Sequence, residues 1–222
     1  MPGQKISERL KQYGFKASIL QAMRAAVRKI YRVQHDILFL MPVFCGCQYD
    51  NPCIKELTKE RISHLTKAGE LTRAENSLFQ EFLTEGSRGI FAEIKGRVAG
   101  YAWVQYAGIY QVGPHVRMPI PPEYAVVKNL YVRPAFRGQK IGQQLNLARL
   151  SIIPAGLIPA VFILPENRYA IRNWERLGFQ KMLFLKQWQW AGQPWRVRVA
   201  SFSDSFAAEP VRKALLHHPG AL

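Results

Sequence analysis

Glycine and basic residues gather in the segment 137–142, which reads Arg-Gly-Gln-Lys-Ile-Gly. The stretch before it, 124–132, is rich in β-branched and aromatic residues and predicts a strand that Pro134 ends. Apolar residues recur behind it at roughly helical spacing, so we expect a helix to begin near Gly138. Unpaired N–H groups and the helix dipole attract anions at such a helix start. The segment therefore predicts a phosphate-binding turn, although two glycines alone also fit an ordinary strand-to-helix loop.

A second strand and helix follow downstream. Residues 159–164 are fully apolar and predict a buried strand. The next helix has an apolar face made of Ala170, Ile171, Trp174 and Leu177. Gly178 is well suited to end this helix. Asn167 lies just before it and is either its N-terminal cap or a ligand-binding residue.

Together the two segments resemble the acyl-CoA signature of the GNAT superfamily of N-acyltransferases. That signature has a hydrophobic strand, a proline, an aromatic residue and Arg-Gly-x-x-Ile-Gly, all of which occur between Leu130 and Gly142. In the family an asparagine, a short helix and Gly-Phe follow, as they do between Asn167 and Phe179. The family usually has glycine where this chain has Lys140. The resemblance implies an α/β fold with a mixed, mostly antiparallel central sheet that splays apart at the cofactor cleft.

The same resemblance implies transfer of an acyl group, most simply acetyl, from acyl-CoA to an amine by direct attack in a ternary complex. Acetyl-CoA or another acyl-CoA is the co-substrate, and no metal is expected. A bulge beside Leu130–Val132 would free a backbone N–H for the thioester carbonyl, Arg137–Gly142 would hold the pyrophosphate, and Asn167 the pantetheine arm. The cofactor-binding residues implied in this way are Leu130, Tyr131, Val132, Arg137, Gly138, Gln139, Lys140, Ile141, Gly142, Asn167 and Trp174.

The acid and base of the reaction are less evident. Many family members have tyrosine, as proton donor to the leaving thiolate, where this chain has Trp174, and an indole N–H cannot supply that proton. Tyr169 or Tyr131 would substitute, or the thiolate would leave unassisted. The candidate bases are Glu123, just before the central strand, and His115, in the preceding loop. For each of these two the alternative is a solvated loop residue.

Three parts are expected in the chain: an N-terminal segment (1–50), an acyltransferase domain (51–200) and a C-terminal tail (201–222). Ser18–Gln34 has the pattern of an amphipathic basic helix. Met1–Gln34 holds 8 Lys and Arg and 1 acidic residue, so it supplies +7 of the chain's net charge of +16.

Four roles stay open for this basic helix. Three of them are binding to an anionic membrane surface, to nucleic acid or to an acidic partner such as acyl carrier protein. The fourth is packing on the domain with the arginines in water. Nucleic acid ranks low, because no aromatic RNA-binding motif, zinc finger or heptad accompanies the charge. The apolar run Ile37–Val43 that follows is either an added edge strand or half of a membrane-facing surface.

Periodic patterns predict the elements of the central part. Strands are expected at 54–58, 89–94, 98–106, 124–132, 159–164, 181–190 and 195–200, and helices at 59–67 and 74–84. Gly96 and Gly192 suit hairpin turns. Residues 107–122, rich in Pro and Gly, are expected to be a loop that lines the acceptor site. The tail offers little to bury beyond one short helix near 211–216.

Composition agrees with one main domain, because 222 residues with 48% hydrophobic content can bury a core of ordinary size. No run reaches the roughly 18 apolar residues of a membrane span. The first residues do not form a secretory signal, so we expect a cytoplasmic protein or one peripheral to the membrane. Cys45, Cys47 and Cys53, even with His35, match no common zinc spacing, and reduced thiols are expected.

The acceptor stays open. Basic residues in the loop 107–122 suit an acidic or phosphorylated small molecule, and protein amines are equally open, whereas a cationic protein repels polyamines. A homodimer is one open oligomeric state. The competing hypothesis is a catalytically silent GNAT-like module that binds CoA, membrane or nucleic acid through its basic helix. Trp174 favours this module slightly, whereas the intact Arg-Gly-x-x-Ile-Gly turn and Asn167 favour an enzyme.

Overall fold

The computed structural model describes residues 31–113, 116–202 and 205–217. Most of the predicted basic helix, Ser18–Gln34, lies outside this range, as do His115 and His218. The part that is described, Tyr31–Gln34, begins a strand rather than ending a helix, so that end of the prediction is wrong. None of the described helices is long and apolar enough to cross a membrane.

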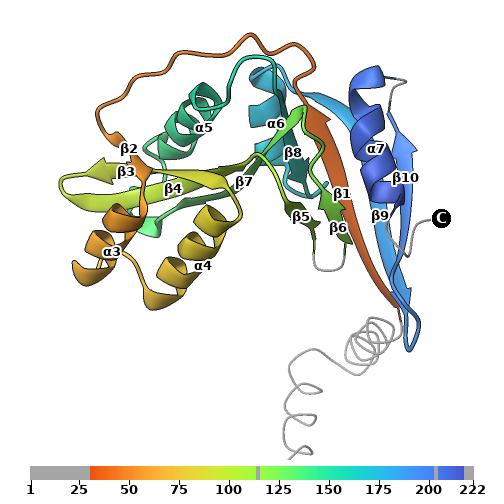
Figure 1. Ribbon diagram of the computed structural model, residues 1–222, viewed down its shortest axis with the longest axis horizontal. Helices are drawn as coiled ribbons and strands as arrows, with labels where there is room; N and C mark the ends of the chain where they lie inside the picture. The colour runs from red at the N-terminus through yellow and green to blue at the C-terminus, as the bar shows by residue number, and fades with distance from the viewer. Residues whose placement is uncertain (1–30, 114–115, 203–204, 218–222) are drawn as a thin grey trace, which may run out of the picture.

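An eight-stranded sheet organises the fold, in the order β10-β9-β1-β8-β7-β4-β3-β2 (Figure 1). Its strands are β1 (Tyr31–Leu40), β2 (Ile54–Leu57), β3 (Ser87–Ile94), β4 (Arg97–Gln105), β7 (Tyr124–Val132), β8 (Ile158–Ile163), β9 (Gln180–Trp190) and β10 (Arg196–Ser201). Neighbouring strands run antiparallel except β7 and β8, which are parallel. The expected mixed, mostly antiparallel sheet is therefore confirmed.

The sheet splays between β7 and β8. Their pairing covers only Tyr124–Val126 against Ile158–Ala160, although β7 continues for six more residues to Val132. The two strands diverge beyond that point, and the sheet opens into two halves, as the ribbon shows (Figure 1). The predicted splay lies at this position.

Helices cover both faces of the sheet. Their bounds are α3 (Lys59–Lys67), α4 (Arg73–Thr84), α5 (Ile141–Ser151), α6 (Arg168–Arg176) and α7 (Glu209–Leu216). On one face α3 and α4 bury Phe79 and Phe82 against Phe91 and Trp103. On the other face α5 packs over β3, β4 and β7, and α6 covers β1 and β8. Because α5 and α6 cover opposite arms of the splay, the space between them faces the opening in the sheet.

Local sequence explains how several of these elements begin and turn. Thr72 and Glu75 form a capping box at the start of α4, in which each side chain accepts a hydrogen bond from the other's backbone N–H. Lys95 and Gly96 both have positive φ, as the tight turn of the β3–β4 hairpin requires. Together these signals fix α4 and β4, which flank one side of the site described below.

The apolar run at Ile37 forms an internal strand, so its prediction as an edge strand was wrong. β1 lies between β8 and β9 and pairs with both. Leu38, Phe39 and Leu40 are completely buried. A continuous apolar run is typical of a strand covered on both faces, whereas an edge strand needs less burial.

The expected loop 107–122 contains a hairpin instead, made of β5 (Ile109–Val112) and β6 (Val116–Pro119). Val112, Val116 and Met118 are buried against β1, β8 and α7. Each of these short strands buries alternate residues, a pattern that the surrounding Pro and Gly obscure in the sequence.

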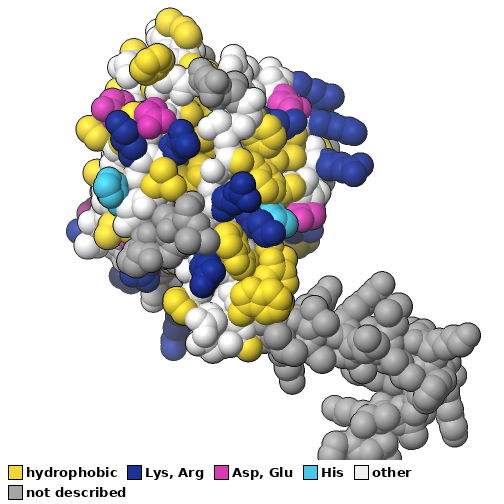
Figure 2. All heavy atoms as spheres, turned by 90° about the vertical axis from the view of Figure 1, so that its right-hand side faces the viewer, with side chains coloured by type: hydrophobic (Ala, Val, Ile, Leu, Met, Phe, Trp, Pro, Cys, Tyr) yellow, Lys and Arg dark blue, Asp and Glu magenta, His cyan; other side chains and the backbone are white. Residues whose placement is uncertain are grey.

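The C-terminal tail is part of the core. α7 buries Val211 and Leu215, and the Tyr124 hydroxyl donates a hydrogen bond to the backbone carbonyl of Ala207. The short helix was predicted, but its burial was not. Figure 2 views this side of the molecule, where hydrophobic side chains lie exposed between clusters of Lys and Arg.

Truncating the α7 anchor should destabilise the whole fold. Leu215 is fully buried, so Leu215→Ala should lower the free energy of unfolding by about 2–5 kcal/mol, as for other buried leucines. Its neighbour Leu216 is 40% exposed and serves as the matched control. Urea denaturation of both variants measures the effect. If both variants lower the free energy of unfolding by the same small amount, α7 docks only loosely on the core.

Candidate functional site

A β-bulge distorts β7 at the point where the sheet opens. Tyr101 of β4 pairs with Tyr131, and Trp103 pairs with Lys128, so β7 holds one more residue than β4 over this stretch. Asn129 has φ of 48°, a left-handed conformation that asparagine tolerates. The expected bulge beside Leu130–Val132 is therefore confirmed. Such a bulge releases backbone groups from the ladder and leaves them free to bind a ligand.

The basic turn after β7 has the geometry of an anion site. A short 3-10 turn at Pro134–Phe136 leads through Gly138, with φ of 80°, to α5, whose N-cap is Lys140. Lys140 itself has φ of 60°, a conformation that favours glycine and explains why related signatures have glycine there. The first residues of α5, where N–H groups lack partners within the helix, line the larger cavity described next.

Two adjacent cavities lie between α5 and α6, and we call them together the α5–α6 groove. The larger, of about 510 Å³, is lined by Leu130, Val132, Phe136, Arg137, Gly138, Lys140, Ile141, Gly142, Gln143 and Tyr169. The smaller, of about 140 Å³, is lined by Leu130, Gly142, Gln143, Asn146, Asn167, Tyr169, Ala170, Asn173 and Trp174. They share Leu130, Gly142, Gln143 and Tyr169. The groove thus runs from the basic turn to the splay.

Most of the predicted cofactor-binding residues line this groove, and two do not. The Tyr131 ring lies on the opposite face of β7, with its centroid 5.4 Å from that of Tyr101. Gln139 is exposed in the turn and lines neither cavity. The indole of Trp174 is buried and packs edge-on against Phe179, 4.5 Å between ring centroids.

Asn167 caps α6 and also lines the groove. Its Oδ1 accepts a hydrogen bond from Ala170 N at 3.1 Å, which confirms the capping prediction. At the other end, Gly178 N donates to Glu175 O and Phe179 N donates to Trp174 O, the hydrogen-bond pattern of a glycine C-cap. Both ends of α6 are therefore fixed by local sequence.

The two roles of Asn167 can be separated by substitution. Asn167→Ala removes the cap and should lower the free energy of unfolding by about 1 kcal/mol. Asn167→Asp keeps a capping oxygen and adds charge to the groove, so it should retain stability while weakening the binding of an anionic ligand. Thermal unfolding and ligand titration of both variants measure the two effects. Unchanged ligand binding in Asn167→Asp would remove Asn167 from the site.

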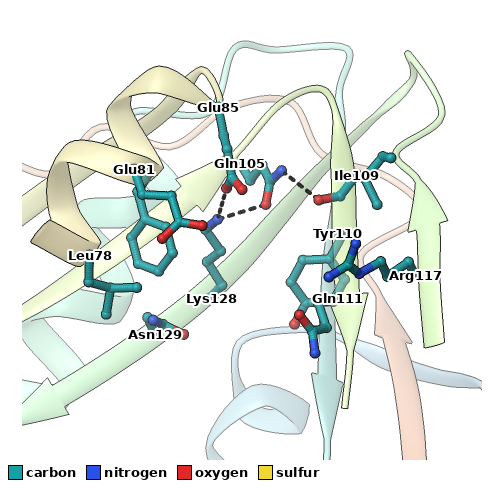
Figure 3. A pocket seen from close by; sticks show the side chains of 11 residues that line it. Leu78, Glu81, Glu85, Gln105, Ile109, Tyr110, Gln111, Arg117, Lys128 and Asn129 are labelled. Atoms are coloured by element: carbon teal, nitrogen blue, oxygen red, sulfur yellow. Dashed lines mark hydrogen bonds and ion pairs between the residues drawn. The ribbon is translucent and has the colours of Figure 1, made fainter. Parts of the chain in front are cut away.

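A third cavity, of about 500 Å³, lies on the opposite face of β7, between α4 and β5 (Figure 3). We call it the α4–β5 cavity. Its lining is Leu78, Glu81, Phe82, Glu85, Gln105, Ile109, Tyr110, Gln111, Arg117, Lys128 and Asn129. Lys128 and Asn129 directly precede Leu130, which lines the groove. The two spaces therefore meet across the bulge in β7.

Lys128 is the buried cation of the α4–β5 cavity. Its Nζ donates to Gln105 Oε1 at 2.7 Å and lies 3.3 Å from Glu85 Oε2 and 4.0 Å from the centre of the Phe82 ring. Burial lowers the pKa of Lys128, and the negative charges of Glu85 and Glu81 oppose that shift. Figure 3 shows Glu81, in the last turn of α4, and Glu85, directly after its end, both pointing toward this ammonium.

The structure separates the predicted acid and base candidates. Glu123 lies at the start of β7, six residues before the bulge residue Asn129, or about 20 Å along an extended strand. It lines neither the groove nor the α4–β5 cavity. Tyr169 lines the groove but its side chain is 77% exposed. His115 lies outside the described residues.

Sequence reasoning missed Glu81, Glu85 and Lys128. Glu81 lies in the predicted helix 74–84, and Glu85 follows directly after its end. Residues four apart share one face of a helix, so this signal was available. What no local pattern shows is that this face lies across from Lys128 and the bulge. That juxtaposition depends on how α4 packs on the sheet.

The three cysteines are free thiols, and Cys45 and Cys53 are exposed. Over residues 31–113, 116–202 and 205–217, no group of three or more His, Cys, Asp or Glu side chains is arranged to hold a metal ion.

Comparison with protein-family models identifies the family. The sequence model of the acetyltransferase (GNAT) family matches residues 54–179. No curated protein sequence matches the chain. Among solved structures, a protein described as a GNAT-family acetyltransferase from Novosphingobium aromaticivorans is 19% identical, with a TM-score of 0.49, over 70% of this chain and 63% of that one.

Two further structures are similar at the same low level. An aminoglycoside N-acetyltransferase in complex with CoA is 20% identical, with a TM-score of 0.41, over 57% of this chain and 90% of its own. A GCN5-related N-acetyltransferase from Sphaerobacter thermophilus is 14% identical, with a TM-score of 0.46, over 80% of this chain and 57% of its own. The chain thus spans less than two thirds of the Novosphingobium and Sphaerobacter proteins.

Proposed function

Because the chain belongs to the GNAT family of acetyltransferases, we propose that it transfers an acyl group from acyl-CoA to an amine acceptor held in the same complex. The observation that carries this proposal is the pair of cavities that meet across the bulge in β7. A thioester in the α5–α6 groove and an amine in the α4–β5 cavity would approach each other there. Holding both reactants in place supplies much of the rate acceleration in reactions of this kind.

The α5–α6 groove suits the phosphates and the pantetheine arm of CoA. Arg137, Lys140 and the start of α5 offer positive charge and N–H donors at one end. A Cβ added at Gly138 would have no atom within 4 Å, so the backbone there is open to a phosphate. Toward the splay the lining includes the side-chain amides of Asn146 and Asn173, which match the amide groups of pantetheine.

The bulge would supply the electrostatic part of catalysis. When the acceptor nitrogen bonds to the thioester carbon, negative charge develops on the carbonyl oxygen before the carbon–sulfur bond breaks. A backbone N–H released by the bulge next to Leu130 would donate a hydrogen bond to that oxygen. CoA then leaves as its thiolate.

The acceptor amine must lose a proton, and we assign this step to Glu81. Glu85 already forms an ion pair with Lys128. Among the residues that the structure describes, Glu81 forms no ion pair. Both carboxylates attract a cationic amine into the cavity. Glu81 would take the proton directly or through one water molecule. Arg117 on the far wall favours an acceptor that also carries an anionic group.

Calorimetry tests the cofactor half of this proposal. Acetyl-CoA should bind with micromolar affinity at near-physiological salt, and the Arg137→Ala, Gly142→Trp double variant should lose that binding. A screen of amines that follows release of free CoA thiol then tests the transfer. If acetyl-CoA and longer acyl-CoAs all fail to bind, the enzyme proposal is wrong.

A catalytically silent module that binds CoA is the second candidate. Trp174 favours it, because the indole at this position cannot protonate a leaving thiolate. This module would bind acetyl-CoA as tightly as an enzyme but release no thiol with any amine. The same screen therefore separates the two.

A further inference from the structure

A buried guanidinium lies where the two arms of the splay meet. Arg149 of α5 is only 3% exposed. Its Nη1 donates to the backbone carbonyl of Lys128 at 3.2 Å, and its Nη2 donates to Asn146 Oδ1 at 2.5 Å. Its Cζ lies 4.8 Å from the centre of the Trp174 ring. Arg149 therefore touches β7 on one arm of the splay and α6 on the other.

This positive charge has no anionic partner among the described residues. No carboxylate forms an ion pair with Arg149, and its Nε has no hydrogen-bond partner. Tyr110 is near enough to interact with it, but burial raises the pKa of that phenol to about 12 and keeps it neutral. Burial also lowers the pKa of Arg149 to about 9, which still leaves the guanidinium protonated at neutral pH. Burying such a charge without a counter-ion is costly.

The neighbours of Arg149 place it beside the inner end of the α5–α6 groove. Asn146 and Trp174, which hold its guanidinium, both line the smaller groove cavity together with Leu130. Lys128, whose carbonyl it binds, directly precedes the bulge. An acyl group carried on pantetheine would extend to this end of the groove, just past the thioester.

We propose that Arg149 recognises a carboxylate on the transferred acyl group, so that the preferred donor is a dicarboxylic acyl-CoA of malonyl or succinyl length. This inference rests on the proposed acyltransferase function. A carboxylate two or three bonds beyond the thioester carbon would provide the missing counter-ion and an acceptor for the free Nε–H. Arginine is well suited to this task, because its planar donors match the two carboxylate oxygens.

The acyl group fits this role better than the acceptor does. Arg149 belongs to α5, and the two side chains that its guanidinium contacts directly, Asn146 and Trp174, line the groove. Its other neighbours, the Lys128 carbonyl and Tyr110, belong to residues that line the α4–β5 cavity, so Arg149 lies where the groove meets that cavity, as the acyl group would. A role limited to stabilising the CoA thiolate makes a different prediction, because it would affect all acyl-CoAs alike. The experiment below separates the two roles.

Calorimetry on the full-length protein compares length-matched thioesters. Malonyl-CoA is compared with propionyl-CoA, and succinyl-CoA with butyryl-CoA, since each pair differs only by the terminal carboxylate in place of a methyl group. The wild type should bind at least one dicarboxylic donor about 10-fold or more tightly than its neutral counterpart, as expected for a buried charge-assisted hydrogen bond. Arg149→Met should abolish that preference. The exposed Arg176→Met serves as the matched control and should retain it.

Each other outcome overturns the inference. Equal affinity of the wild type for charged and neutral donors would overturn the inference even if Arg149→Met fails to fold. An equal loss for all four thioesters in Arg149→Met would assign the residue to the thiolate or to the fold, and would leave the proposed function intact. If neither CoA nor any thioester binds, the proposed function fails as well.

Discussion

Gly142→Trp should raise the dissociation constant for acetyl-CoA by at least about 100-fold, close to complete loss of binding. Gly142 lines both cavities of the α5–α6 groove at the start of α5. An indole at this position would occupy the space next to the helix N-terminus and exclude the phosphates from their N–H donors. Calorimetric titration measures the loss, and thermal unfolding verifies that the variant is folded.

Gly142→Ala provides the matched control for steric exclusion. A Cβ at this position would lie 3.7 Å from Val132 Cγ2 and 3.8 Å from Leu130 Cδ2, which are ordinary packing distances. The alanine variant should therefore bind acetyl-CoA within a few-fold of the wild type and fold at least as well, because alanine favours helix. Tight binding by Gly142→Trp would mean that the groove is not the cofactor site.

Glu81→Gln should lower kcat about 10²–10⁴-fold while leaving the KM for acyl-CoA unchanged. The amide keeps the size of the side chain but cannot accept a proton from the acceptor amine. In the proposed arrangement the cofactor would occupy the α5–α6 groove on the other face of β7, so its binding should not respond. Steady-state kinetics with the best acceptor from the amine screen provides both constants.

Glu123→Gln is the comparison that decides where the base lies. Glu123 was one of the two candidate bases in the sequence, with His115, and it lies at the far end of β7 from the bulge. We expect this variant to retain wild-type kcat. Loss of rate in Glu123→Gln, with none in Glu81→Gln, would reverse the assignment. Equal, modest losses in both would indicate that neither carboxylate is the base.

The parts of the site that local sequence determines were predictable. The strand, the glycine turn and the start of α5 are adjacent in the chain, and each has its own signal in Pro134, Gly138 and the apolar spacing of α5. The same holds for α6, whose cap Asn167 and terminator Gly178 are its immediate neighbours. Lys140 adopts the left-handed backbone conformation that favours glycine, so the turn keeps the geometry of the signature although the residue differs.

The parts that depend on packing between distant segments were not predictable. The α4–β5 cavity combines Glu81, Gln105, Arg117 and Lys128 from four elements, and none of them has a local pattern that identifies its neighbours. Arg149 looks like a solvent-facing residue in the sequence of an amphipathic helix. Only the splay of the sheet, which places α6 over one arm and α5 over the other, buries it.

The internal position of β1 has a consequence for how the chain folds during synthesis. β1 ends at Leu40, but its partners β8 and β9 end at Ile163 and Trp190. At about 5–20 residues per second, roughly 8–30 seconds of translation separate β1 from the completion of β9. Until β8 and then β9 have been synthesised, Leu38, Phe39 and Leu40 have no strand to pair with. We therefore expect folding to be late and slow, because these contacts are distant in sequence, and we expect the nascent chain to expose an aggregation-prone strand that chaperones would shield.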